Sequence, residues 1–246
     1  MSYLARCLSL LQLLAAGPDD GLTLSELAQR SSVPVSTASR LAQLLEERGF
    51  ARRLENRRFV PGPALLTLGL RSLRSLPAER YQEVLESLAQ ATGESVSIGL
   101  VVGNEIVLVA RYESPHTLRA VASVGDVIPP HRSAMGKAIL SHVDDARRRT
   151  VLTTAVGADA GAVAAEINDE LERAAVEGFA RDEEQFTVGL RCIAAPLCGP
   201  GGQAIGAISI AGPAARFSRE IADTFVPALL EQTRQLADPV PVEVRR

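Results

Sequence analysis

Residues 23–60 read TLSELAQRSSVPVSTASRLAQLLEERGFARRLENRRFV, and this stretch decides how the N-terminal part of the chain folds. Thr23 can cap a short helix, because Glu26 follows three residues later and completes a capping box. Two serines interrupt that helix, and Pro34 suits the first position of a second helix. Residues 51–60 then alternate weakly around a turn and are rich in arginine. This order predicts a helix-turn-helix followed by a two-stranded basic wing.

The second predicted helix has two unlike faces. One arc is apolar and runs through Leu41 and Leu45, whereas the opposite arc carries short hydroxyl side chains and one long cation, Arg40. A recognition helix needs such a polar face because it lies deep in the major groove of DNA. Hydroxyl groups can bind phosphates or base edges, and arginine can bind guanine through two hydrogen bonds. For the arc taken alone, a solvated helix face is the alternative interpretation.

The predicted wing favours DNA binding. Its four arginines flank the turn at Asn56, and four cations on a short hairpin repel one another unless a polyanion is near. Contact with DNA phosphates is therefore expected, and the expected partner is double-stranded DNA. The candidate DNA-binding residues from both elements are Thr23, Ser36, Thr37, Ser39, Arg40, Arg52, Arg57 and Arg58.

The charge is distributed unevenly along the chain. The 246 residues carry a formal net charge of −3. Residues 1–75 hold ten arginines and six acidic residues, a charge of +4, which leaves −7 for the remainder. The basic N-terminal part is therefore expected to bind DNA, and the acidic remainder is expected to have another task.

The length of 246 residues suits two domains or one large one, and the composition favours a folded protein in a reducing cytoplasm. Hydrophobic residues make up 46% of the chain, enough for real cores, but no apolar run is long enough to span a bilayer. Residues 1–17 are expected to form the first helix of the DNA-binding domain rather than a signal peptide, with Leu4, Leu8, Leu11 and Ala15 on its apolar face. The three cysteines are scattered and imply no disulfide framework.

The rest of the sequence predicts a linker and a second domain. We expect the DNA-binding domain at residues 1–61, an apolar linker helix at 62–76 that packs against a partner copy, and the second domain at 77–246. Its predicted helices are a first one from Pro77 to Gly93, a short one at 133–142, one from Ala160 to Glu177, and a last one from Arg219 to Leu236. Its predicted strands are a hairpin at 93–112, a third strand from Leu118 to Val124, and two more around 191–198 and 203–211. This is an α+β pattern with a mainly antiparallel sheet.

Three segments resemble the IclR family of transcriptional regulators, and the resemblance extends over nearly the full length. They are VPVSTASRLAQLLEERGF at 33–50, VGDVIPPHRSAMGKAIL at 124–140, and GFARDEEQFTVGLRCIAAPLCGPGGQAIGAISIAGP at 178–213. The resemblance implies an N-terminal winged helix, a linker helix and a C-terminal effector-binding domain of GAF-like fold. It also implies a homodimer or homotetramer that binds an inverted-repeat operator and a small-molecule effector.

The resemblance also implies an effector pocket. Its expected contacts are Leu118, Ala134, Met135, Asp182, Cys192, Ser209 and Ala211. The family often has serine where Ala211 stands and a smaller residue where Met135 stands. We therefore expect a less polar, reshaped pocket, which favours a larger or more apolar effector over a small dicarboxylate.

The same pocket can be argued from the residues themselves. The N–H groups of a helix that begins near Ser133 can bind an anion or a carbonyl group. Asp182 and Ser209 can hold the polar end of a ligand. Each residue also has a structural alternative: Cys192 as packed core, Asp182 as part of a solvated acidic loop, and Ser209 bound to the backbone.

The expected function is a cytoplasmic regulator of transcription, expected to be a repressor of a catabolic operon, that responds to a small organic or aromatic acid. A repressor and an activator would share the same residues. No cofactor, no catalytic residue and no metal site are expected. One alternative is a hydrolase with Cys192 as nucleophile and His131 as base, although no recognisable catalytic motif surrounds them. Another is a zinc sensor that uses Cys192, Cys198 and a histidine, although five residues between the cysteines are not a compact metal-binding spacing.

Overall fold

The computed structural model describes residues 2–73, 78–199 and 201–237. The chain divides into two compact units, residues 1–78 and 79–246, and each unit is described by itself. Part of the predicted linker helix and the last residues of the chain lie outside the described residues. No single helix among those described is long and apolar enough to cross a membrane.

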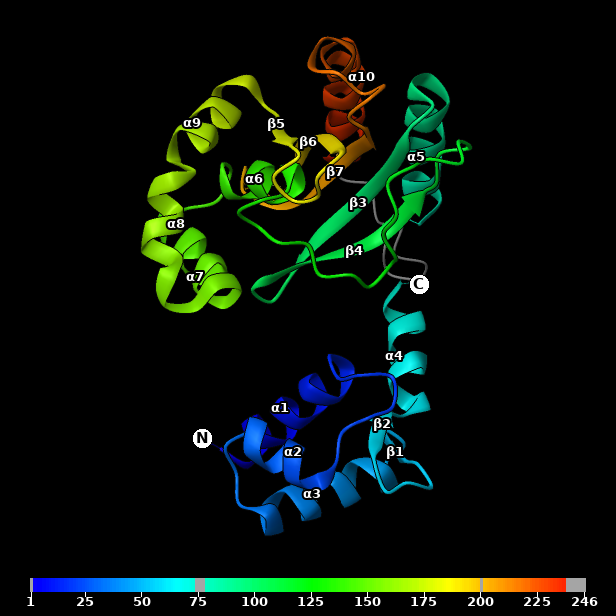
Figure 1. Ribbon diagram of the computed structural model, residues 1–246, viewed down its shortest axis with the longest axis vertical. Helices are drawn as coiled ribbons and strands as arrows, with labels where there is room; N and C mark the ends of the chain where they lie inside the picture. Colours follow the sequence, from blue (N-terminus) through cyan, green and yellow to red (C-terminus); the bar gives the residue numbers. More distant parts are fainter. Residues whose placement is uncertain (1, 74–77, 200, 238–246) are drawn as a thin grey trace, which may run out of the picture. The chain divides into compact units, whose positions relative to one another are not determined.

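The N-terminal unit is a winged helix-turn-helix, as the sequence predicts (Figure 1). Its elements are α1 (Tyr3–Ala15), α2 (Leu24–Arg30), α3 (Val35–Glu47), β1 (Ala51–Arg53), β2 (Phe59–Pro61) and α4 (Pro63–Leu73). The Thr23 hydroxyl accepts a hydrogen bond from the Glu26 N–H, and the Glu26 carboxylate accepts one from the Thr23 N–H, so the predicted capping box is present. Val33 is buried in the turn between α2 and α3.

Two details of the N-terminal prediction are wrong. Pro34 is the residue before α3 rather than its first residue, and the helix begins at Val35. The apolar face of α1 is also rotated: Leu10 and Leu14 are buried, whereas Leu4 and Leu8 are exposed. α1 is apolar over more than one face, and periodicity alone therefore selected the wrong stripe.

The C-terminal unit contains a five-stranded antiparallel sheet in the order β4-β3-β7-β6-β5. The strands are β3 (Ser95–Val102), β4 (Glu105–Tyr112), β5 (Ala180–Glu183), β6 (Leu190–Cys198) and β7 (Ala204–Pro213). The helices are α5 (Ala78–Thr92), α6 (Ala134–Leu140), α7 (Asp145–Val156), α8 (Ala160–Glu166), α9 (Asn168–Glu177) and α10 (Arg219–Ala237), with a 3-10 turn η1 (Gly157–Asp159) between α7 and α8.

Two predictions for this unit are wrong, and two of its elements were not predicted. The stretch from Leu118 to Val124 is not a strand but a loop, and only Val127 in the adjoining segment forms a bridge with β4. β5, at the edge of the sheet next to β6, was not predicted, because the acidic run that contains Asp182 favoured a solvated loop. The single helix expected from Ala160 to Glu177 breaks at Ile167 into α8 and α9, and α7 was missed.

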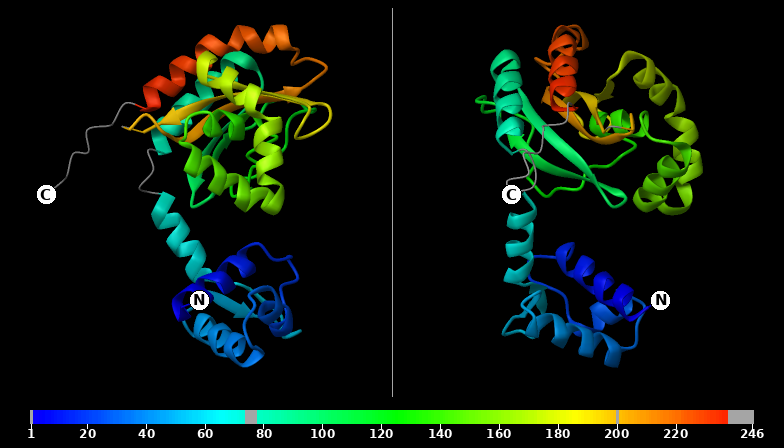
Figure 2. Two further views of the ribbon diagram at one scale, coloured as in Figure 1. Left: turned by 90° about the vertical axis from the view of Figure 1, so that its left-hand side faces the viewer. Right: turned by 180° about the vertical axis from the view of Figure 1, so that it is seen from behind.

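The two faces of the sheet carry different side chains because strand residues alternate between them. Large aliphatic residues such as Ile98, Ile193 and Ile210 face one side and form a core with α5 and α10. Short residues such as Ala194 and Ala207 face the other side, where α6 packs. Figure 2 shows α5 and α10 on one side of the sheet and α6 to α9 on the other. The face with the short side chains, on the α6 side of the sheet, leaves space for a cavity.

Candidate functional site

The outer face of α3 matches the predicted recognition surface. Ser36, Ser39 and Arg40 are exposed and Thr37 is half-buried, whereas Leu41 and its apolar neighbours are buried in the unit's core. The face that carries Ser36, Ser39 and Arg40 is therefore not part of the unit's core. It presents three hydroxyl groups and one guanidinium, which can reach base edges or phosphates.

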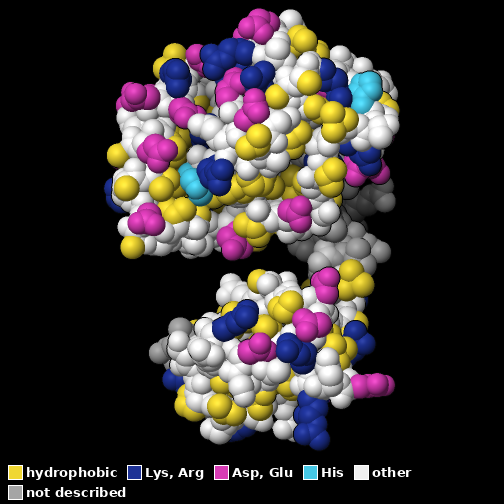
Figure 3. All heavy atoms as spheres, viewed as in Figure 1, with side chains coloured by type: hydrophobic (Ala, Val, Ile, Leu, Met, Phe, Trp, Pro, Cys, Tyr) yellow, Lys and Arg dark blue, Asp and Glu magenta, His cyan; other side chains and the backbone are white. Residues whose placement is uncertain are grey.

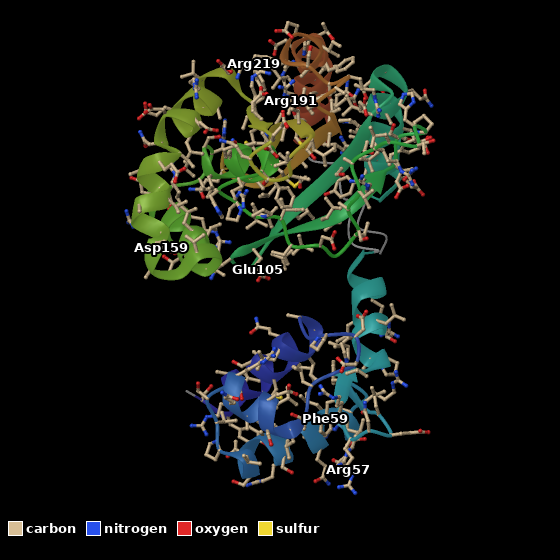
Figure 4. All side chains as sticks on the ribbon, viewed as in Figure 1. Arg57, Phe59, Glu105, Asp159, Arg191 and Arg219 are labelled. Atoms are coloured by element: carbon tan, nitrogen blue, oxygen red, sulfur yellow. The ribbon has the colours of Figure 1, made fainter. Side chains whose placement is uncertain are left out.

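The wing adds exposed cations beside that face. Arg52 and Arg57 are exposed, and Arg57 occupies the left-handed region with φ of 64° at the turn. Arg53 lies over the ring of Phe59, with 5.6 Å between its guanidinium carbon and the ring centroid. Figure 4 labels Arg57 at the end of the wing, and Figure 3 shows basic side chains projecting there. A groove bounded by Ser39 on α3 and by Arg57 lies between the two elements.

Two of the predicted DNA-binding residues have structural partners of their own. Arg58 is half-buried, donates to the Gly21 carbonyl at 2.7 Å, and pairs with Glu26 at 3.5 Å and Asp20 at 3.7 Å. The Thr23 hydroxyl is used by the capping box. Arg58 ties the wing to the start of α2 and Thr23 caps that helix, so the phosphate-binding role predicted for them is less direct than for Arg57.

A cavity of about 290 Å³ lies on the inner face of the C-terminal sheet. The strand register explains which residues form its floor. In one row Arg111 of β4 lies opposite Ser97 of β3, and Ser97 lies opposite Ser209 of β7. In the next row Ala211 of β7 lies opposite Cys192, and Cys192 lies opposite Asp182 of β5. The floor thus has a cation at one end and a carboxylate at the other.

Six of the seven predicted pocket residues line this cavity. They are Ala134, Met135, Asp182, Cys192, Ser209 and Ala211. Leu118 does not, because its segment is a loop rather than a strand, and its side chain is 66% exposed. Val121 of the same loop and Val127 of the adjoining segment line the cavity instead.

Arg111 is the polar residue that the sequence reasoning missed. It donates to the Ser97 hydroxyl at 3.0 Å and to the Ala120 carbonyl, while its Nε is buried without a hydrogen-bond partner. Burial lowers the pKa of its guanidinium, yet arginine stays charged in proteins. A signal was present in the alternation of β3: Val96 and Ile98 face the large core, so Ser97 and its cross-strand neighbour must face the other side.

Asp182 is fully buried at the opposite end of the floor, with 1% of its surface exposed. One carboxylate oxygen, Oδ1, accepts hydrogen bonds from the backbone N–H groups of Gln185 at 2.8 Å and Phe186 at 3.2 Å. Burial raises the pKa of this carboxyl, although those two N–H groups act against the rise. The alternative of a solvated acidic loop is therefore wrong for Asp182.

The loop between β5 and β6 forms one wall of the cavity through Phe186 and Thr187. Gln185 fixes this loop with every polar group it has. Its N–H binds Asp182, its backbone carbonyl accepts from the Arg132 Nε at 2.7 Å, and its side-chain amide joins Lys137 and Glu170. Lys137 is 1% exposed and also pairs with Glu170. The wall is thus held from α6 and α9.

The remaining residues concern the predicted anion site at α6 and the two alternative functions. Ser133 caps α6 by accepting from the Gly136 N–H at 3.0 Å, so that N–H group is already used. Burial raises the pKa of the Cys192 thiol, which opposes formation of a nucleophilic thiolate. His131 lines a separate hollow beside Glu105 and Pro129, not the cavity that holds Cys192. Within residues 2–73, 78–199 and 201–237, no three metal-binding side chains form a group.

Known proteins match this chain over both units. The family described as the IclR helix-turn-helix domain matches residues 3–55, and the family described as the bacterial transcriptional regulator IclR C-terminal domain matches residues 75–238. The HTH-type transcriptional regulator BhcR of Paracoccus denitrificans is 31% identical over 95% of this chain and 85% of its own length. The transcriptional repressor IclR of Escherichia coli is 26% identical over 95% of this chain and 88% of its own length.

Solved structures agree with the fold. An IclR-family transcriptional regulator from Brucella abortus superposes with a TM-score of 0.84 at 19% identity, over 98% of this chain and 93% of its own. An IclR homologue from Microbacterium hydrocarbonoxydans in complex with 4-hydroxybenzoate superposes with a TM-score of 0.69 at 23% identity, over 96% of this chain and 98% of its own. The winged helix, the sheet with its inner cavity and these matches together place the chain in the IclR family of transcriptional regulators.

Proposed function

We propose that the chain is a cytoplasmic repressor of a catabolic operon, and that a small organic acid controls its affinity for DNA. An aromatic carboxylate is the class of acid that best fits the cavity. The observation that carries the effector class is Arg111, a half-buried cation with a buried Nε, on the floor of a cavity of about 290 Å³. A carboxylate beside it gains an ion pair together with the charge-assisted hydrogen bond, whereas a neutral ligand gains only the hydrogen bond. Much of the remaining lining is apolar and suits a ring.

The opposite end of the cavity suggests a second requirement. Asp182 is an acceptor there, so the effector is expected to carry a donor, such as a hydroxyl group, away from its carboxylate. The missing hydroxyl at Ala211 agrees with an effector that is less polar than a small dicarboxylate. Among proteins of this fold, the Microbacterium homologue was crystallised with 4-hydroxybenzoate, a compound of this type.

The DNA-binding half of the proposal rests on the exposed face of α3 and on the wing. We propose that Ser36, Thr37, Ser39 and Arg40 contact an operator half-site, while Arg52 and Arg57 bind phosphates, with Thr23 and Arg58 supporting them. Two such units in a homodimer or homotetramer would read an inverted repeat. The repressor role is supported by relatives with such names, including the acetate operon repressor of Salmonella typhimurium, 27% identical.

The test combines effector and DNA binding. Purified protein is titrated onto its own promoter region with and without benzoate and 4-hydroxybenzoate, while calorimetry measures binding of each acid. We expect one of these acids to bind the wild type and to change its affinity for DNA. Arg111→Met should abolish acid binding but leave DNA binding intact.

Arg119→Met is the matched control, because Arg119 pairs with Glu113 on the surface and does not line the cavity. Acid binding that survives in Arg111→Met would contradict the proposed carboxylate anchor. A wild-type protein with no salt-sensitive affinity for its promoter would contradict the regulatory function itself.

A further inference from the structure

A glycine in the middle of β3 leaves a slot beneath the effector cavity. A Cβ built on Gly99 would lie 2.2 Å from the Met135 Sδ and 3.3 Å from its Cε. The first distance is far below any real contact, so the thioether of Met135 occupies the place that a side chain at position 99 would fill. The φ angle of Gly99 is not positive, so other residues could adopt its backbone conformation as well. Glycine is needed at this position to make room for the methionine side chain.

Met135 cannot make that room by moving its helix. α6 packs close to the sheet through small residues, among them Ala138 of the helix and Ala194 and Ala207 of the strands. Its first turn is held from the other side as well, because a Cβ at Gly136 would lie 2.3 Å from the Pro130 carbonyl oxygen. α6 is therefore packed closely on both sides, against the sheet and against residues 129–130. The side chain of Met135 has two places to go: the slot at Gly99 or the cavity.

The cavity is the open side of this arrangement. Met135 is 3% exposed and lines the cavity together with Leu108, and Ile106 closes the far side of the slot at 3.4 Å from the same Cβ position. Methionine is unbranched and flexible, so its thioether can follow the available space without a large strain. A side chain at position 99 should displace the Met135 thioether into the cavity, and removing the thioether should deepen the cavity.

We infer that Gly99 and Met135 together set the size of effector that the cavity accepts, with Gly99 as a specificity-determining residue that never touches the ligand. This inference rests on the proposed function, because it concerns the same cavity. It predicts an order of cavity depth: Met135→Ala is deepest, Gly99→Ala with Met135→Ala is next, the wild type follows, and Gly99→Ala is shallowest.

The experiment measures binding of two ring sizes by calorimetry to the full-length wild type and these three variants. The probes are benzoate and 2-naphthoate, together with their neutral counterparts benzyl alcohol and 2-naphthalenemethanol. We expect the affinity ratio of the naphthyl to the phenyl probe to follow the predicted depth order. Each step should change the ratio by about tenfold, the usual discrimination by one methylene in an apolar pocket. Gly161→Ala is the matched control, because a Cβ there meets nothing within 4 Å, and it should leave the ratio unchanged.

The outcomes separate this inference from the proposed function. If only the neutral probes bind and their ratio follows the order, the size-setting pair is supported and the carboxylate effector is wrong. If the acids bind but Gly99→Ala and Met135→Ala leave the ratio as in the wild type, the pair does not set effector size while the proposed function stands. Binding of no probe to any variant would overturn the inference too. Thermal denaturation of each variant and its affinity for promoter DNA show that the variants are folded.

Discussion

The buried ammonium of Lys137 leads to an asymmetric prediction for stability. Its Nζ is bound by Glu170 and by Gln185, and the side chain is 1% exposed, whereas the side chain of Glu170 is 31% exposed. Glu170→Ala leaves a desolvated cation with one neutral acceptor. Lys137→Met leaves a carboxylate that water can reach and fills the same space with an apolar side chain. Loss of the acid should therefore cost much more than loss of the base.

The magnitude follows from the two burials. Removing one partner of a fully buried ion pair costs about 3–5 kcal/mol, and surface pairs contribute about 0–1 kcal/mol. Because one partner here is buried and Gln185 remains, we expect Glu170→Ala to lower the free energy of unfolding by about 2–4 kcal/mol. Lys137→Met should change it by about 1 kcal/mol or less, in either direction. Glu170→Gln keeps an oxygen acceptor and should fall between the two.

Urea denaturation followed by tyrosine fluorescence measures these changes, because Tyr81 and Tyr112 belong to the C-terminal unit. The pKa of Glu170 is lowered: burial raises it, but the hydrogen bonds from Lys137 and Gln185 together outweigh that effect. Its stabilising contribution is therefore present above its ordinary pKa of 4.5 and is lost as the pH falls through the lower folded value. Glu170→Ala should lack this acid-dependent loss. If Lys137→Met proved as costly as Glu170→Ala, the reasoning from burial would be refuted.

Three further predictions concern other parts of the chain. Arg57→Ala should weaken binding to all DNA sequences alike and reduce the slope of affinity against salt by about one, whereas Arg40→Ala should also relax sequence preference; a mobility-shift titration on operator and random duplexes checks both. Thr23→Ala removes the capping box and should lower the stability of the N-terminal unit by about 1 kcal/mol in thermal denaturation, and an unchanged melting temperature would contradict it. Arg216→Met leaves Glu94, whose side chain is 5% exposed, without its cation; because Arg216 itself is 33% exposed, the loss should be about 2–4 kcal/mol in urea denaturation, and Glu94→Gln with Arg216→Met should recover part of it.

The N-terminal unit could be predicted almost completely from the sequence, because its signals are local. The capping box at Thr23, the proline before α3 and the glycine after it each act within a few residues. The errors arose where local signals were ambiguous. α1 is apolar around much of its circumference, and only packing against the other helices decides that Leu10 and Leu14 are buried.

The cavity could be predicted only in part, because its floor is assembled by strand register. Asp182, Cys192 and Ser209 were found through family resemblance, but their neighbour Arg111 comes from a distant hairpin and meets Ser209 only through Ser97. The alternation of β3 pointed to Ser97, yet the pairing of β3 with β7 cannot be read from either strand alone. Leu118 was misplaced because its apolar pattern resembles a strand, while the structure gives that segment no pairing partner.

The anchoring of Arg58 changes how salt titrations of this protein should be interpreted. Its guanidinium links the wing to Glu26 and Asp20 through partly exposed ion pairs, which added electrolyte weakens. Raising the ionic strength therefore acts twice, by displacing the protein from phosphates and by loosening the hairpin that carries Arg57. The number of counterions deduced from such a titration will exceed the number of phosphates touched. In Arg58→Met the hairpin has already lost those ion pairs. A salt titration of this variant should therefore give a smaller number of released counterions, closer to the number of phosphates that the protein contacts.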